Sequence, residues 1–157
     1  MSKELDARTS DPTVLKLMQG FPPEVDKTVR LQDGTSGSFP NIRWAFVHQR
    51  ELKPTANIRR GSGAVYQFPK RLRDDLDAVP FTTIDGQKLT WGQSLDANFT
   101  DGILVLHRGA IIYETYRSAL EPHLPHLAMS MTKSFTGLLA AMLAHEGKLD
   151  PQALVTS

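Results

Sequence analysis

Residues 126–150 read HLAMSMTKSFTGLLAAMLAHEGKLD and place a serine and a lysine at the start of an apolar run. The apolar residues recur at i, i+3, i+4, i+7 and i+8, which is one face of a helix. They are Phe135, Leu138, Leu139, Met142 and Leu143. Gly147 is typical of the position just after a helix, and Asp150-Pro151 is typical of the start of another. The pattern predicts a long helix that begins near Ser130.

Ser130 and Lys133 are three residues apart at the start of this helix, so their side chains share a face. A serine hydroxyl becomes a good nucleophile when a base takes its proton. A lysine can be that base when its surroundings favour the neutral amine. The free N–H groups of a helix start can stabilise an oxyanion. The pair therefore fits acyl transfer through an acyl-enzyme, although S-x-x-K alone also fits a polar helix start with a solvated lysine.

Composition limits the other classes of function. A chain of 157 residues with 40% hydrophobic and 22% charged residues fits one soluble globular domain. The net charge of +1 gives no support to a nucleic-acid partner. The absence of cysteine excludes disulfides and thiolate metal sites. No segment has the form of a signal peptide, and the apolar run GLLAAMLA is too short for a membrane span. We expect a cytoplasmic protein without a membrane partner.

Turn residues divide the rest of the chain. Residues 1–40 predict a loosely structured arm, because they are rich in glycine, proline and other turn formers. Trp44 and Phe46 alternate, which indicates a short strand or an extended segment. Residues 69–79 place Leu72, Leu76 and Val79 on one helical face. A hairpin is expected around Asp85-Gly86, followed by a short helix over residues 90–98.

Residues 103–116 predict a second hairpin. Residues 103–106 are apolar on both faces, so we expect a buried central strand, and residues 111–116 return with one wetter face.

The histidines of H-x-x-H, His123 and His126, could bind a metal. Prolines break their helical spacing, and no acidic third ligand is evident. We therefore expect neither a metal nor another cofactor. Trp44 and Trp91 are expected to be packing anchors.

Residues 100–151 contain a predicted hairpin, then a link interrupted by prolines, and then the helix that begins with S-x-x-K. Their sequence is TDGILVLHRGAIIYETYRSALEPHLPHLAMSMTKSFTGLLAAMLAHEGKLDP. This stretch resembles serine hydrolases of the β-lactamase and penicillin-binding-protein superfamily, within it the class C-like branch. NIRWAFVHQRELKPTANI, residues 41–58, further resembles the 6-aminohexanoate-dimer hydrolases. The resemblance covers residues 41–157. It implies an α+β fold with an antiparallel sheet flanked by helices, an acylated Ser130, and Lys133 assisting its deprotonation. The implied substrate is a linear amide of the aminohexanoate-oligomer type, with an ester or a β-lactam as the alternative.

The family also uses a tyrosine motif and a K-T-G-like motif after the S-x-x-K helix. Here every tyrosine precedes Ser130: Tyr66, Tyr113 and Tyr116. We therefore expect residues 41–157 to form the N-terminal part of a β-lactamase-like domain, with the catalytic residues Ser130 and Lys133 only. The competing interpretation is a non-catalytic fragment, which self-associates or needs a second chain that supplies the C-terminal part.

Overall fold

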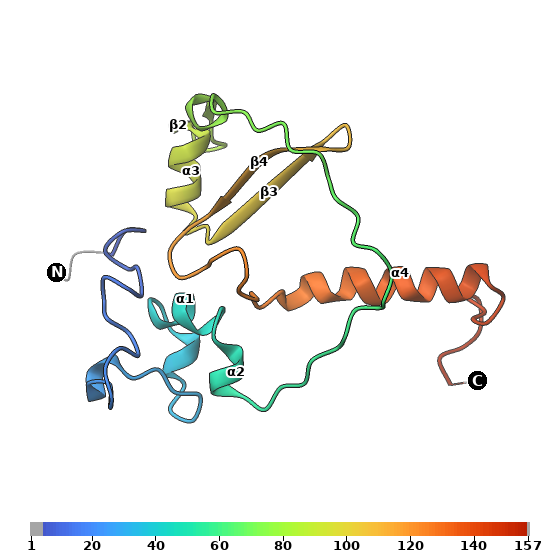
Figure 1. Ribbon diagram of the computed structural model, residues 1–157, viewed down its shortest axis with the longest axis horizontal. Helices are drawn as coiled ribbons and strands as arrows, with labels where there is room; N and C mark the ends of the chain where they lie inside the picture. The colour runs from blue at the N-terminus through green and yellow to red at the C-terminus, as the bar shows by residue number, and fades with distance from the viewer. Residues whose placement is uncertain (1–4, 157) are drawn as a thin grey trace. The chain divides into compact units, whose positions relative to one another are not determined.

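The computed structural model describes residues 5–156 and divides into two compact units, with the division between His126 and Leu127 (Figure 1). Residues 1–4 of the expected arm and Ser157 of the expected domain lie outside the described residues. The structure mixes helices with two small antiparallel sheets, so the expected α+β class is confirmed at that level.

The first unit begins with a helical layer. Its elements are η1 (Val25–Lys27), η2 (Thr35–Gly37), α1 (Asn41–Ala45) and α2 (Gln49–Leu52). Leu17, Val29, Trp44 and Ala45 form its buried core. The strand expected at Trp44 and Phe46 is wrong. Trp44 and Ala45 are buried as consecutive residues, as a helix can arrange but an alternating strand cannot.

Arg43 of α1 fixes the N-terminal segment against this layer. Its side chain is only 6% exposed, and Nη1 donates to the backbone oxygen of Ala7 and to Ser10 Oγ, both at 2.7 Å. Its Nη2 lies 3.8 Å from Asp101 Oδ1, and the guanidinium lies 5.6 Å from the ring centroid of Phe99. A planar guanidinium with several fixed donors suits such a site better than an ammonium would.

The helix expected over residues 69–79 is wrong. Residues 69–73 are extended, and only one 3₁₀ turn forms, η3 (Leu76–Ala78). The N–H groups of Arg71 and Arg73 donate to the oxygens of Ile111 and Ile112, at 2.8 and 2.9 Å. The edge of the neighbouring strand thus accepts hydrogen bonds from the backbone N–H groups of this segment. Tertiary pairing overrides the local helical pattern.

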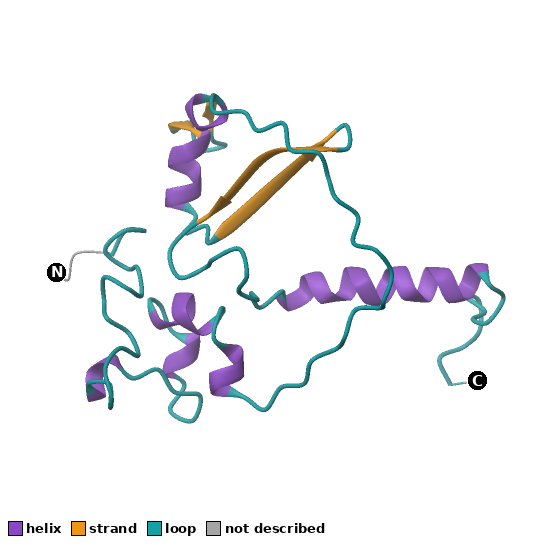
Figure 2. Ribbon diagram, viewed as in Figure 1, coloured by secondary structure: helices purple, strands orange, loops and turns teal. Residues whose placement is uncertain are grey.

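Two hairpins follow, both where the sequence predicts them. The first pairs β1 (Pro80–Thr82) with β2 (Lys88–Thr90), and Gly86 in its turn has a φ of +85°. The expected short helix is α3 (Trp91–Ala97), which Thr90 and Gln93 close with a capping box. Figure 2 shows these elements beside the long loop that precedes them.

The second hairpin pairs β3 (Gly102–His107) with β4 (Ala110–Tyr116). The expected burial of the first strand is wrong. Ala110, Ile111 and Tyr113 of β4 are buried, whereas Leu104 and Leu106 of β3 are 51% and 47% exposed. Residues 69–73 cover the second edge of β4, but no strand among residues 5–156 pairs with the second edge of β3. The apolar strand is therefore the outer one.

The second unit contains η4 (Met129–Met131) and α4 (Thr132–His145), which confirm the helix predicted near Ser130. Gly147 has a φ of +70° just after α4, and its N–H donates to the oxygen of Ala144. Asp150 Oδ1 accepts from the N–H of Gln152, but the described residues after it form turns, so the helix expected at Pro151 is wrong.

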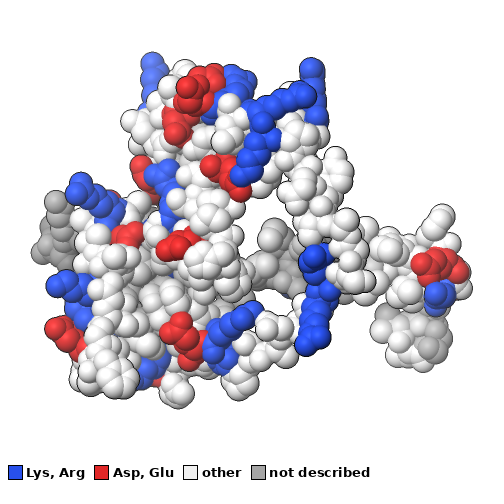
Figure 3. All heavy atoms as spheres, viewed as in Figure 1, with Lys and Arg blue, Asp and Glu red and all other residues white. Residues whose placement is uncertain are grey.

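Charged side chains of both signs lie on the face that Figure 3 shows. Figure 3 shows lysine and arginine side chains mixed with aspartate and glutamate over the visible face, in keeping with the net charge of +1. In the part of the chain that the structure describes, no helix combines the length and apolar composition that a membrane crossing needs.

Candidate active site

The structure brings Ser130 and Lys133 into contact. Ser130 lies in η4, Lys133 lies in the first turn of α4, and Lys133 Nζ donates to Ser130 Oγ at 3.1 Å. The 3₁₀ turn runs directly into the α-helix, so the i, i+3 spacing stacks the two side chains. Both residues are exposed. The predicted pair therefore forms locally and needs no residue of the first unit to align it.

The start of α4 has no side-chain cap. Its N-cap position is Met131, whose side chain cannot cap, and no side-chain hydrogen bond closes the helix start. The residue before the serine, Met129, has a positive φ of 47°, which is uncommon for a residue with a side chain. The 3₁₀ turn occupies the two N–H groups that follow Ser130, because that of Met131 donates to the oxygen of Ala128 and that of Thr132 to the oxygen of Met129.

The α4 apolar face, which we define as Phe135, Leu138, Leu139 and Met142, is uncovered. Each side chain is between 53% and 67% exposed. The pattern that predicts the helix is thus present, but nothing among the described residues buries it. An amphipathic helix in a globular protein normally packs this face against a core.

The tyrosines upstream of Ser130 make structural contacts. Tyr113 donates to Asp77 Oδ1 at 2.5 Å, and its ring lies edge-on to Trp91. Burial, followed by the bond to Asp77, raises the pKa of Tyr113 above its usual value. Tyr116 donates to Glu114 Oε1 at 2.8 Å, and this bond raises the pKa of Tyr116. Both hydroxyls are thus occupied within the first unit.

The two histidines weighed as metal ligands have carboxylate neighbours. His126 Nε2 lies 3.1 Å from Asp101 Oδ2, and His123 Nδ1 lies 3.5 Å from Glu121 Oε2. Within residues 5–156, no three side chains of the types that bind metals gather as a site. His126 thus ties the proline-broken link to Asp101 before β3, whereas the contact of His123 lies within the link itself.

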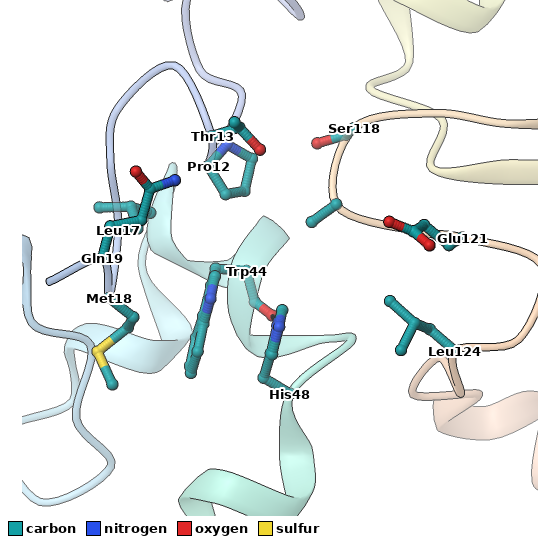
Figure 4. A pocket seen from close by; sticks show the side chains of 11 residues that line it. Pro12, Thr13, Leu17, Met18, Gln19, Trp44, His48, Ser118, Glu121 and Leu124 are labelled. Carbon is teal, nitrogen blue, oxygen red and sulfur yellow. Dashed lines mark hydrogen bonds between the residues drawn. The ribbon is translucent and has the colours of Figure 1, made fainter.

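A pocket of about 310 Å³ lies in the first unit, and no sequence motif predicts it. Its walls come from three separated stretches, and Figure 4 shows Trp44 and His48 opposite Ser118, Glu121 and Leu124. The rings of Trp44 and His48 stack with centroids 4.1 Å apart, and His48 Nδ1 lies 2.8 Å from the oxygen of Trp44. Only the fold brings these stretches together, so no local motif could reveal the pocket.

Comparison with known proteins identifies relatives of this chain. The chain matches no protein-family profile. It is 36% identical over 117 residues to the 6-aminohexanoate-dimer hydrolase of Paenarthrobacter ureafaciens, which covers 74% of this chain and 28% of the relative. A solved structure of a candidate 6-aminohexanoate-dimer hydrolase from Bacillus anthracis superposes with a TM-score of 0.69 and 26% identity, covering 80% of this chain and 33% of that one.

The resemblance predicted from the sequence is thereby confirmed. The chain spans about a third or less of the length of the proteins it matches. It is a homologue, over part of their length, of proteins named 6-aminohexanoate-dimer hydrolase.

Proposed function

We propose that this chain carries the nucleophile of a serine hydrolase, with Ser130 as the acylated residue and Lys133 as its base. The observation that carries the proposal is the 3.1 Å contact between Lys133 Nζ and Ser130 Oγ at the uncapped start of α4. The names of the homologues support a hydrolase of the amidase type. They also support a β-lactamase-like fold, of which this chain is the N-terminal part.

The proposed reaction proceeds in two steps. Ser130 Oγ attacks the carbonyl carbon of an amide while its proton passes to the neutral amine of Lys133. Lys133 then gives this proton to the leaving nitrogen, the C–N bond breaks, and the amine product departs as the acyl-enzyme forms. Water then hydrolyses the ester on Ser130 and releases the acid. The N–H of Ser130 itself helps to stabilise the oxyanion in both steps. No metal or organic cofactor takes part.

The proposed substrate class is a linear amide such as an aminohexanoate oligomer. The support is the name of the homologues, which denotes a dimer of 6-aminohexanoate. An ester or a β-lactam is the alternative substrate, since the same acyl-enzyme steps cleave both. A panel containing one linear amide, one p-nitrophenyl ester and one cephalosporin separates these alternatives.

A non-catalytic fragment is the competing proposal for the chain by itself. The observation that favours it is the exposure of Ser130 and Lys133 together with the uncovered α4 apolar face. We therefore expect slow acylation and negligible turnover from the isolated chain.

Labelling with a fluorophosphonate tests the nucleophile without requiring turnover. We expect slow labelling of the wild type, none of Ser130→Ala, and a rate lower by roughly a hundredfold in Lys133→Ala, the usual scale of a general base. Ser134→Ala, one position beyond the lysine, is the matched control and should label at the wild-type rate. Equal labelling of Ser130→Ala and the wild type would refute the proposal.

A further inference from the structure

The pocket beside Trp44 and His48 lies within the first unit and has the size of a small-molecule site. Its volume of about 310 Å³ is at the lower end of the range of roughly 300–1,000 Å³ that ligand pockets occupy. Its walls come from residues 12–19, 44–48 and 118–124. No described residue of the second unit contributes to them. A ligand with a few carbon atoms therefore fits a pocket that the first unit forms by itself.

The charge on the pocket walls is negative. Among the described residues that line the pocket there is no lysine, arginine or aspartate, and Glu121 is the only glutamate. Figure 4 shows the carboxylate of Glu121 turned toward Trp44 and His48 across the pocket. His123 Nδ1 lies 3.5 Å from Glu121 Oε2, whereas Oε1 has no ion-pair partner within residues 5–156. Such a carboxylate repels an anionic ligand and attracts a cationic one.

A hydroxyl group and two aromatic rings add to this preference. Ser118, whose φ of 57° is uncommon for a residue with a side chain, lines the pocket. Its Oγ is buried and has no hydrogen-bond partner among the described residues, so it can accept a bond from a ligand N–H. On the opposite wall, the rings of Trp44 and His48 stack with centroids 4.1 Å apart. Aromatic faces, that of indole above all, attract cations.

We propose that this pocket binds a small organic cation, namely a protonated primary amine on a short alkyl chain. The ammonium group lies between Glu121 and the aromatic pair, where Ser118 Oγ accepts one of its N–H groups, and the chain contacts Leu124. A metal ion fits less well, because it needs several oxygen or nitrogen ligands and no three residues of metal-binding types gather within residues 5–156. This binding goes beyond the proposed hydrolysis, because it does not involve Ser130.

Nuclear magnetic resonance of protein labelled with nitrogen-15 in its indole groups tests the site. The chain contains two tryptophans, of which only Trp44 lines the pocket. Titration with n-pentylammonium chloride should shift the Trp44 signal and leave that of Trp91 in place, with Trp91→Phe assigning the two. One exposed ion pair and one cation–π contact predict a dissociation constant on the order of 1 mM. The uncharged 1-pentanol and the anion pentanoate should each bind more weakly by about fivefold or more.

Matched variants test the contribution of the carboxylate. Glu121→Gln removes the charge from an exposed side chain and keeps its shape, and should weaken n-pentylammonium binding about fivefold, the scale of one exposed ion pair. Glu51→Gln is the control, because Glu51 is also exposed and its Oε1 lies 4.0 Å from His48 Nε2, but it does not line the pocket. This control should bind like the wild type. Without ligand, the indole signals of both variants should match those of the wild type.

Four results each overturn the proposal: no shift of the Trp44 signal at tens of millimolar n-pentylammonium, equal shifts of Trp44 and Trp91, binding of 1-pentanol as tight as that of n-pentylammonium, or equal weakening by Glu121→Gln and Glu51→Gln. Ser130→Ala keeps the proposed function separate, because it should bind the amine normally but never label with fluorophosphonate. Amine binding by a wild type that does not label contradicts the proposed nucleophile alone. Labelling of a wild type that does not bind the amine contradicts the cation site alone.

Discussion

Arg43 is the residue whose loss should cost the first unit most. Arg43→Ala removes two hydrogen bonds of 2.7 Å, to the oxygen of Ala7 and to Ser10 Oγ, and leaves Ser10, which is fully buried, without this donor. Bonds from a charged group contribute about 1.5–3 kcal/mol each. Arg43 Nε and Asp101 Oδ1 have no hydrogen-bond partner among the described residues, so we take the lower end for each bond. The expected loss is about 3 kcal/mol.

Urea unfolding followed by tryptophan fluorescence measures this loss, because Trp44 is buried in the same layer. Arg43→Lys keeps the charge but not the planar fork, and should lose about half as much. Arg50→Ala is the matched control, since Arg50 is exposed and bonds only to Asn57 among the contacts described here. It should change the free energy of unfolding by less than about 0.5 kcal/mol. Similar values for Arg43→Ala and Arg50→Ala would refute the reasoning.

Three further predictions concern the first unit. Tyr113→Phe loses the bond to Asp77 and should cost about 1 kcal/mol of unfolding free energy in urea. Because the pKa of Tyr113 is raised, the wild type should lose more stability than this variant as the pH rises above 10.0, where the unfolded tyrosine ionises first. The bond from Lys70 lowers the pKa of Glu114, so the stability that this ion pair adds to the fold is complete above pH 4.5 and is lost as the pH falls below that value. If the melting temperature of Glu114→Gln falls with acid as much as that of the wild type, this prediction is wrong. The exposed residues 53–68 should be the first site of trypsin cleavage, seen as one early cut at their two arginines by mass spectrometry.

Local signals explain which elements the sequence predicts correctly. The turn at Gly86, the capping box at Thr90 and the apolar period of α4 each act within a few residues. Such features need no partner elsewhere in the chain. The spacing of Ser130 and Lys133 belongs to the same class, and their contact forms as the spacing predicts.

The wrong predictions share a different cause. Residues 69–73 have a helical pattern, but the edge of β4 offers backbone partners that a helix cannot use. The apolar run of β3 predicts burial, yet burial depends on what packs over it, and the described chain supplies no strand there. The pocket beside Trp44 and His48 likewise depends on contacts between distant stretches. The hydrophobic pattern of a segment predicts a helix or a strand, but contacts with distant segments decide whether that element forms and whether it is buried.

The position of the acyl group tests the central claim most directly. The chain is incubated with the p-nitrophenyl ester of 6-acetamidohexanoate, quenched in acid and mapped by tandem mass spectrometry. We predict that the acyl group is on Ser130 Oγ, and that Lys133→Ala carries much less of it. An acyl group on Ser134 or on any other residue, with Ser130 unmodified, would contradict the assignment of the nucleophile.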